Sequence, residues 1–96
     1  MSRTITYDLG HRHQEVIRLE VTFTADAELV RRVAWSFRPG EAPRRVSHDL
    51  TLPAEDFEVD IEVENERGEI SLDRRELDGR ERGDVVFHIE TPETRR

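Results

Sequence analysis

Apolar and polar residues alternate along most of the chain, which is the pattern of β-strands with one buried face. The clearest example is DFEVDIEVEN at residues 56–65, where four apolar side chains alternate with five carboxylates. The other segments with a period of two are residues 5–9, 17–23, 33–37, 46–52, 70–72 and 85–89. Seven short strands in a chain of 96 residues predict an all-β fold, an antiparallel seven-stranded β-sandwich.

Turn-forming residues separate these segments. Arg38-Pro39-Gly40-Glu41 has proline at the second position of a turn and glycine at the third. Asn65-Glu66-Arg67-Gly68 predicts a hairpin that ends in glycine. Residues 1–90 are expected to form a single domain, and residues 91–96, which have no apolar side chain, to form a frayed tail.

Residues 26–37 allow two interpretations. Asp26 could cap a helix with one apolar face, which would make the fold α+β. We favour a strand because Trp35-Ser36-Phe37 leads into Pro39-Gly40, like the first arm of a hairpin. Trp35 is then expected near the centre of the sandwich.

Residues 50–63, LTLPAEDFEVDIEV, resemble a pattern of prealbumin-like, Ig-like sandwiches such as the carboxypeptidase regulatory-like domains. In those domains a strand ends in Leu-Pro, a short turn with glycine follows, and an aromatic residue begins the next strand. Phe57 stands at the aromatic position, and Glu55 stands where the glycine would be. The resemblance implies an accessory or interaction module and carries over no functional residue.

Composition restricts the possible functions. The chain has no cysteine, which excludes disulfides, thiolate zinc sites and cysteine nucleophiles. All 15 basic residues are arginine, and the net charge of −7 argues against nucleic acid and anionic membranes as partners. We find no segment typical of a signal peptide or a transmembrane helix, and therefore expect a cytoplasmic protein.

The acidic row of residues 56–65 is the most prominent charged feature. Neighbouring carboxylates on one face of a strand are about 6.7 Å apart, too far to converge on a calcium ion. Calcium would fit better at the end loops, for instance at Glu55-Asp56 with Asp26 or Asp84. The row could also form cross-strand ion pairs on a solvated face, or attract a basic partner. The arginines expected to pair with it are Arg18, Arg74 and Arg75.

Histidines and hydroxyls offer little further chemistry. His11 and His13 could hold zinc only if two more ligands approached. Ser47, His48 and Asp49 are consecutive, so a strand would send them to alternate faces and not into one catalytic site. His48 is expected at the edge of the core, with its ring hydrogen-bonded to the backbone. We therefore predict no enzyme activity and assign no catalytic residue, cofactor or resident metal.

The sequence predicts a non-catalytic protein-interaction or structural module. Its acidic sheet face would meet a protein partner with an Arg/Lys-rich surface through Glu58, Asp60, Glu62 and Glu64. Two alternatives stay open. One is binding of a metal or small ligand through the end loops, by His11, His13 or the Glu55-Asp56 turn. The other is self-assembly through an edge strand.

Overall fold

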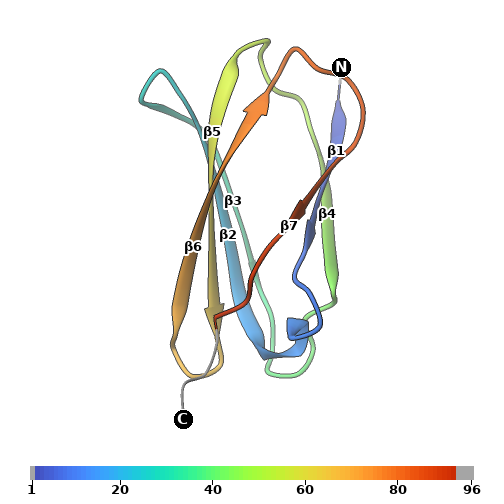
Figure 1. Ribbon diagram of the computed structural model, residues 1–96, viewed down its shortest axis with the longest axis vertical. Coiled ribbons are helices and arrows are strands. Elements are labelled where there is room, and N and C mark those ends of the chain that lie inside the picture. The colour runs from blue at the N-terminus through green and yellow to red at the C-terminus, as the bar shows by residue number, and fades with distance from the viewer. Residues whose placement is uncertain (1, 93–96) are drawn as a thin grey trace.

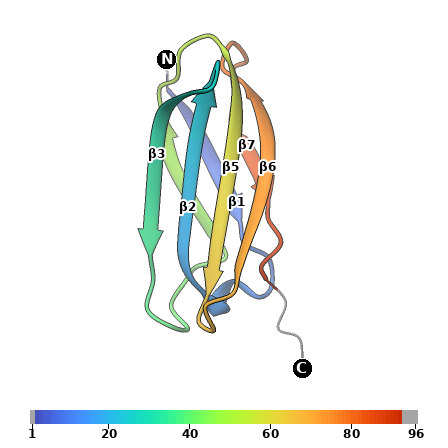
Figure 2. The same cartoon turned by 90° about the vertical axis from the view of Figure 1, so that its left-hand side faces the viewer.

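The protein, analysed as a computed structural model that describes residues 2–92, is built of two β-sheets. The strands are β1 (Arg3–Asp8), β2 (Val16–Ala25), β3 (Glu28–Ser36), β4 (Arg45–Leu50), β5 (Asp56–Asn65), β6 (Ile70–Asp78) and β7 (Val85–His88), and a short 3₁₀-helix, η1 (His13–Glu15), precedes β2. The smaller sheet has the order β4-β1-β7 and the larger one β3-β2-β5-β6. The two sheets face each other as layers (Figures 1 and 2). The all-β prediction is confirmed, and this arrangement is consistent with a sandwich.

Strand direction differs from the prediction at one place. All three pairs of the larger sheet are antiparallel, and so is β1 with β4. β1 and β7, however, run parallel. The chain crosses from β6 in one sheet to β7 in the other, and this crossing lets β7 run in the same direction as β1 (Figure 1).

Within residues 26–37, Glu28–Ser36 form a strand, as favoured, and the α+β alternative is wrong. β3 pairs with β2 through a tight turn at Asp26 and Ala27, whose φ angles are 50° and 62°. Two positive φ angles are what a two-residue type I′ hairpin requires. The hairpin predicted at Pro39-Gly40 is wrong, because β3 and β4 belong to different sheets and residues 37–44 cross between them (Figure 2).

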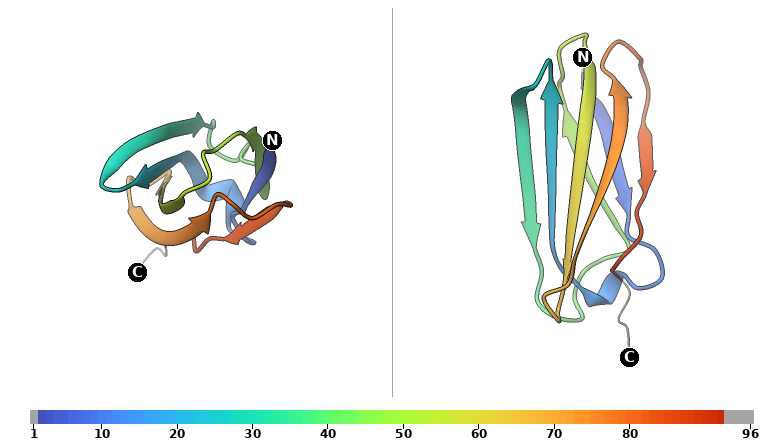
Figure 3. Two further views of the ribbon diagram at one scale, coloured as in Figure 1. Left: turned by 90° about the horizontal axis from the view of Figure 1, so that it is seen from above. Right: turned by 60° about the vertical axis from the view of Figure 1, so that its left-hand side comes forward.

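The two sheets lie as separate layers when the molecule is seen from above (Figure 3). Buried side chains from both sheets form a single core cluster. Tyr7 from the smaller sheet and Phe23 from the larger one are its bulkiest fully buried side chains. Trp35 is not near the centre, contrary to the prediction. It lies on the edge strand β3, is only partly buried, and packs against the outside of the core.

The last described residues are held in place. Thr91 and Pro92 are buried, and the Thr91 hydroxyl donates a hydrogen bond of 2.8 Å to the carbonyl oxygen of Leu9. The prediction of a frayed tail is therefore wrong for these two residues, and positions 93–96 lie outside the described residues. Within residues 2–92, no helix has the length and apolar character that crossing a membrane requires.

Candidate functional site

The outer face of the larger sheet carries the predicted acidic row. Alternation sends every second side chain of each strand outward, because the others fill the core. The strands of this face carry eight carboxylates and three guanidiniums: Glu20, Asp56, Glu58, Asp60, Glu62, Glu64, Glu76 and Asp78, with Arg18, Arg32 and Arg74. The four predicted residues lie in line on β5, between β2 and β6 (Figure 2).

One end of the acidic row is paired. The Nε of Arg74 lies 2.7 Å from Oε1 of Glu58 and 2.9 Å from Oδ1 of Asp60. The pKa of Arg74 is raised, mainly by its hydrogen bond to Asp60. Arg74 therefore pairs with the row, as expected, and offsets the charge of these two carboxylates.

The other end of the row is left unpaired. Arg18 lies opposite Glu64 in the sheet, but its guanidinium pairs with Glu20, which also lies 3.6 Å from Arg32. Within residues 2–92, neither Glu62 nor Glu64 takes part in an ion pair. Among the described residues, Glu62 and Glu64 therefore have no cationic group within 4.0 Å, although Arg18 lies opposite Glu64 on the neighbouring strand.

Two exposed apolar side chains adjoin these free carboxylates. Leu72 lies opposite Glu62 and Ile70 lies opposite Glu64 in the β5–β6 register. Their exposed fractions are 60% and 58%. We call Glu62, Glu64, Ile70 and Leu72 together the acidic–apolar patch. Sequence reasoning identified its carboxylates but not its apolar half, although residues 70 and 72 share a parity with Arg74, which was expected on this face.

Arg75 does not pair with the acidic row, contrary to the prediction. It follows Arg74 directly, so its side chain leaves β6 toward the other sheet. There its Nη2 donates a hydrogen bond of 2.9 Å to the carbonyl oxygen of His88, and it lies 4.0 Å from Asp73. Ser71, on the same side of β6, donates a bond of 3.3 Å to the carbonyl oxygen of Glu90. These contacts tie β6 to the segment that contains β7.

The end-loop acids that sequence reasoning considered for calcium are only partly brought together. Asp26 and Asp56 line one open hollow of about 820 Å³, whereas Asp84 does not. Oδ1 of Asp56 accepts a bond of 2.6 Å from Arg80, which also contacts Asp78. The pKa of Asp78 is lowered, mainly by the backbone N–H of Arg80. In the described part of the chain, no three histidine, aspartate or glutamate side chains are placed to hold a metal ion.

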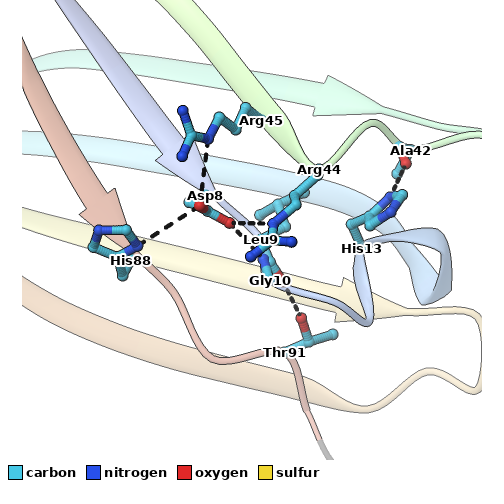
Figure 4. A network of polar contacts seen from close by, with 9 residues as sticks. All are labelled: Asp8, Leu9, Gly10, His13, Ala42, Arg44, Arg45, His88 and Thr91. Carbon is cyan, nitrogen blue, oxygen red and sulfur yellow. Dashed lines mark hydrogen bonds and ion pairs between the residues drawn. The ribbon is translucent and has the colours of Figure 1, made fainter.

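At the opposite end, His13 and His88 contact separate partners (Figure 4). The Nδ1 of His13 forms a bond of 2.7 Å with the carbonyl oxygen of Ala42. His88 lies 3.7 Å from the buried carboxylate of Asp8, which also contacts Arg44 and Arg45. The backbone N–H of Gly10 is the largest influence that lowers the pKa of Asp8, and Arg44 adds to it. This network around Asp8 was not predicted.

His48 lies at the edge of the core but has a different partner from the one expected. Its Nε2 forms a bond of 2.9 Å with the Tyr7 hydroxyl, not with the backbone, and its ring packs edge-on against Trp35. Burial lowers the pKa of His48 and raises that of Tyr7.

The two neighbours of His48 face the other way. The hydroxyls of Ser47 and Thr6 lie 2.7 Å apart on the outer side of the smaller sheet. On the same side, Thr4 donates a bond of 2.6 Å to Asp49. The three consecutive residues 47–49 therefore do not converge on one site.

Comparison with known proteins identifies no relative. No protein-family model matches the chain, and neither a curated protein nor a solved structure is significantly similar to it.

Proposed function

We propose that the outer face of the larger sheet is a docking surface for a basic protein segment, and that the chain is a non-catalytic interaction module. The observation that carries this proposal is the acidic–apolar patch, where two carboxylates that form no ion pair within residues 2–92 adjoin two exposed apolar side chains. Burying apolar surface contributes roughly 25 cal/mol per Å². A partner that covers Ile70 and Leu72 and neutralises Glu62 and Glu64 would gain from both effects.

The docking surface is narrower than the row of four residues that the sequence predicts. Glu58 and Asp60 already share Arg74, so a partner's cation would have to compete with an existing pair. Glu62 and Glu64 have no such competitor among the described residues. We therefore propose that these two carboxylates bind the partner directly. Glu58 and Asp60 add to the negative electrostatic field around them.

The wider charge distribution supports a basic partner. Carboxylates outnumber guanidiniums eight to three on the strands of this face, and the whole chain has a net charge of −7. A negative field of this kind speeds the encounter with a cationic segment and weakens as salt screens it. The proposal therefore implies that binding depends strongly on ionic strength.

We also propose that the two sheets form one seven-stranded module of the prealbumin-like or Ig-like kind. Residues 50–63 support this. Leu52-Pro53 follows β4, and Phe57, at the second position of β5, is buried with an exposed fraction of 2%. An aromatic residue anchored at the start of a strand is what the resemblance implies. A module of this kind is consistent with an interaction role.

The test is titration of a fluorescent peptide in which Arg alternates with Thr, followed by anisotropy at low and moderate salt. The double variant Glu62→Gln/Glu64→Gln is expected to bind about tenfold more weakly, since two surface ion pairs contribute ~0.2–1 kcal/mol each. Glu28→Gln/Glu41→Gln removes the same charge from exposed sites elsewhere and serves as the matched control. Equal affinity of both double variants, or no binding by the wild type, would falsify the proposal.

A further inference from the structure

The edge of β6 that faces away from β5 lies beside the acidic–apolar patch, and on the inner side of β6 Ser71 and Arg75 bind the carbonyl oxygens of Glu90 and His88. β6 pairs with β5 only, so its other edge has no strand partner in residues 2–92. The N–H of Asn65 donates a bond of 3.0 Å to the carbonyl oxygen of Glu69, which sets the alternation of the β5–β6 ladder. Residues opposite each other in an antiparallel pair alternate between bonded and non-bonded pairs. Ile70, Leu72 and Arg74 therefore direct their N–H and C=O groups away from β5, toward the free edge.

The same residues of β6 also place their side chains on the outer face. A strand that bonded to their backbone would lie next to the exposed side chains of Ile70 and Leu72. Glu64 and Glu62 lie one strand further in, on β5. Backbone bonding groups, apolar surface and free charge therefore occur together along one short stretch of sheet edge.

The stretch of β6 edge beside the acidic–apolar patch fits the long side chains of Arg and Lys. Adjacent strands are about 4.8 Å apart, so a side chain from an added strand must pass over β6 to reach β5. The aliphatic stem of Arg or Lys can lie on apolar surface while its charged end reaches a carboxylate. Residues that share a face of the added strand occur at every second position, which matches the spacing of Ile70 and Leu72.

We infer that the edge of β6 accepts an extended segment of a partner protein in which Arg or Lys occupies alternate positions. The segment adds a strand to the sheet, its basic stems cover Ile70 and Leu72, and its charged ends pair with Glu64 and Glu62. Strand addition of this kind draws affinity from main-chain bonds and specificity from alternate side chains. This inference rests on the proposed function and specifies the conformation and sequence pattern of the partner.

A second copy of this chain fits the edge less well. The other edge strand of the same sheet is β3, whose basic residues Arg31 and Arg32 are consecutive. They therefore point to opposite faces and cannot supply two cations to one face. Arg74 and Arg75 of β6 have the same spacing. Charge complementarity therefore favours a partner with alternating basic residues over a copy of this chain.

The test uses the Arg–Thr alternating peptide in three forms: unmodified, N-methylated at every Arg, and N-methylated at every Thr. A strand directs alternate amides to opposite edges, so one methylated peptide is expected to lose affinity by about tenfold while the other binds like the unmodified one. Whether methylation at the Arg positions or at the Thr positions weakens binding also reveals whether the added strand is parallel or antiparallel to β6. Equal binding of the two methylated peptides, strong or weak, overturns strand addition.

A matched pair of variants tests the same inference from the side of the protein. Leu72→Ser removes apolar surface at the edge of β6 and is expected to weaken the unmodified peptide by about tenfold. Leu29→Ser is the control, because Leu29 is also an exposed residue of an edge strand, with an exposed fraction of 56%. If both variants bind alike, the edge of β6 is not the docking site.

The failure of this inference can be separated from failure of the proposed function. If Glu62→Gln/Glu64→Gln weakens the peptide while both methylated forms bind equally, the acidic surface docks a basic partner without strand pairing. Sedimentation at increasing protein concentration tests whether a second copy of this chain occupies the edge of β6 instead. A dimer that Leu72→Ser dissociates would assign the edge to a second copy and overturn the inference.

Discussion

At the scale of single residues, the β2–β3 turn holds the clearest local strain. Asp26 and Ala27 both have positive φ angles, 50° and 62°. Left-handed backbone is unfavourable for residues with a Cβ, by roughly 1–2 kcal/mol, and two-residue hairpins prefer glycine at the second position. Ala27 also has no polar group with which to compensate. The turn therefore forms because β2 and β3 pair over their length, and not because its own residues favour it.

Ala27→Gly is expected to stabilise the protein by about 0.5–1 kcal/mol, because glycine adopts this conformation without steric penalty. Urea denaturation should show a higher midpoint with an unchanged m-value. Ala34→Gly is the matched control, an exposed alanine within β3, where glycine is expected to destabilise by roughly 0.5–1 kcal/mol. A shift of the same sign in both variants would contradict this account of the turn.

The same turn shows what residue-level reasoning could predict. Alternation placed Tyr7, Phe23 and Phe57 correctly on the buried side. It did not predict a hairpin at Asp26-Ala27, because the dipeptide lacks the glycine that marks such turns. The predicted pairing of Arg75 with the acidic row is wrong because Arg75 differs in parity from Arg74 and therefore lies on the opposite face of β6.

At the scale of elements, the junction between β6 and β7 is held by side chains, not by a strand ladder. β7 is a four-residue strand that pairs with β1. On its other side, Arg75 binds the carbonyl oxygen of His88 and Ser71 binds that of Glu90. The polar residues on the inner side of β6 therefore restrain a short strand that has few ladder bonds of its own.

Arg75→Met keeps most of the stem but removes the guanidinium, and is expected to loosen β7. Hydrogen exchange followed by mass spectrometry should show faster exchange in residues 85–88, by about three- to tenfold, the effect of losing a bond worth ~1 kcal/mol. Arg74→Met, one residue away on the outer face, breaks pairs with Glu58 and Asp60 and should leave β7 unchanged. Similar exchange in β7 of both variants would show that Arg75 does not restrain it.

The sequence predicts which segments are strands more readily than it predicts which strands pair. Periodicity shows that a segment is a strand and which of its faces is buried, but it does not show which strand lies beside it. For that reason the sequence predicts a strand within residues 26–37 but not its partner, and the hairpin that it predicts at Pro39-Gly40 would join strands that belong to different sheets. The parallel pairing of β1 with β7 has no local sequence signal, because it joins the two ends of the chain.

At the scale of the whole molecule, the topology concentrates a charge asymmetry that is already present in the sequence. Residues 51–96 contain 15 acidic residues against 7 arginines, whereas residues 1–50 are close to neutral. β5 and β6 both come from the acidic half and are neighbours in the sheet, so negative charge gathers at one side of its outer face. The proposed docking surface lies on that side, at the opposite edge of the sheet from β3, although β2 of the first half lies directly beside β5.

Because the two sheets share one core, we expect them to unfold together. Buried side chains from both sheets belong to one cluster, so neither sheet can keep its inner face covered if the other unfolds. The chain has one tryptophan and one tyrosine, Trp35 in the larger sheet and Tyr7 in the smaller. Their ring centroids are 5.8 Å apart, close enough for tryptophan to quench tyrosine emission in the folded protein.

In a urea titration, the change in Trp35 emission and the appearance of Tyr7 emission are expected to coincide, as in two-state unfolding of a small domain. Far-ultraviolet circular dichroism gives a third measure, which reports both sheets and should have the same midpoint. Trp35→Phe is the control for quenching: Tyr7 emission should then be present in the folded state as well. Tyrosine emission that appears at a lower urea concentration than the change in Trp35 would mean that the smaller sheet unfolds separately. The larger sheet, with the proposed docking face, would then be stable without it.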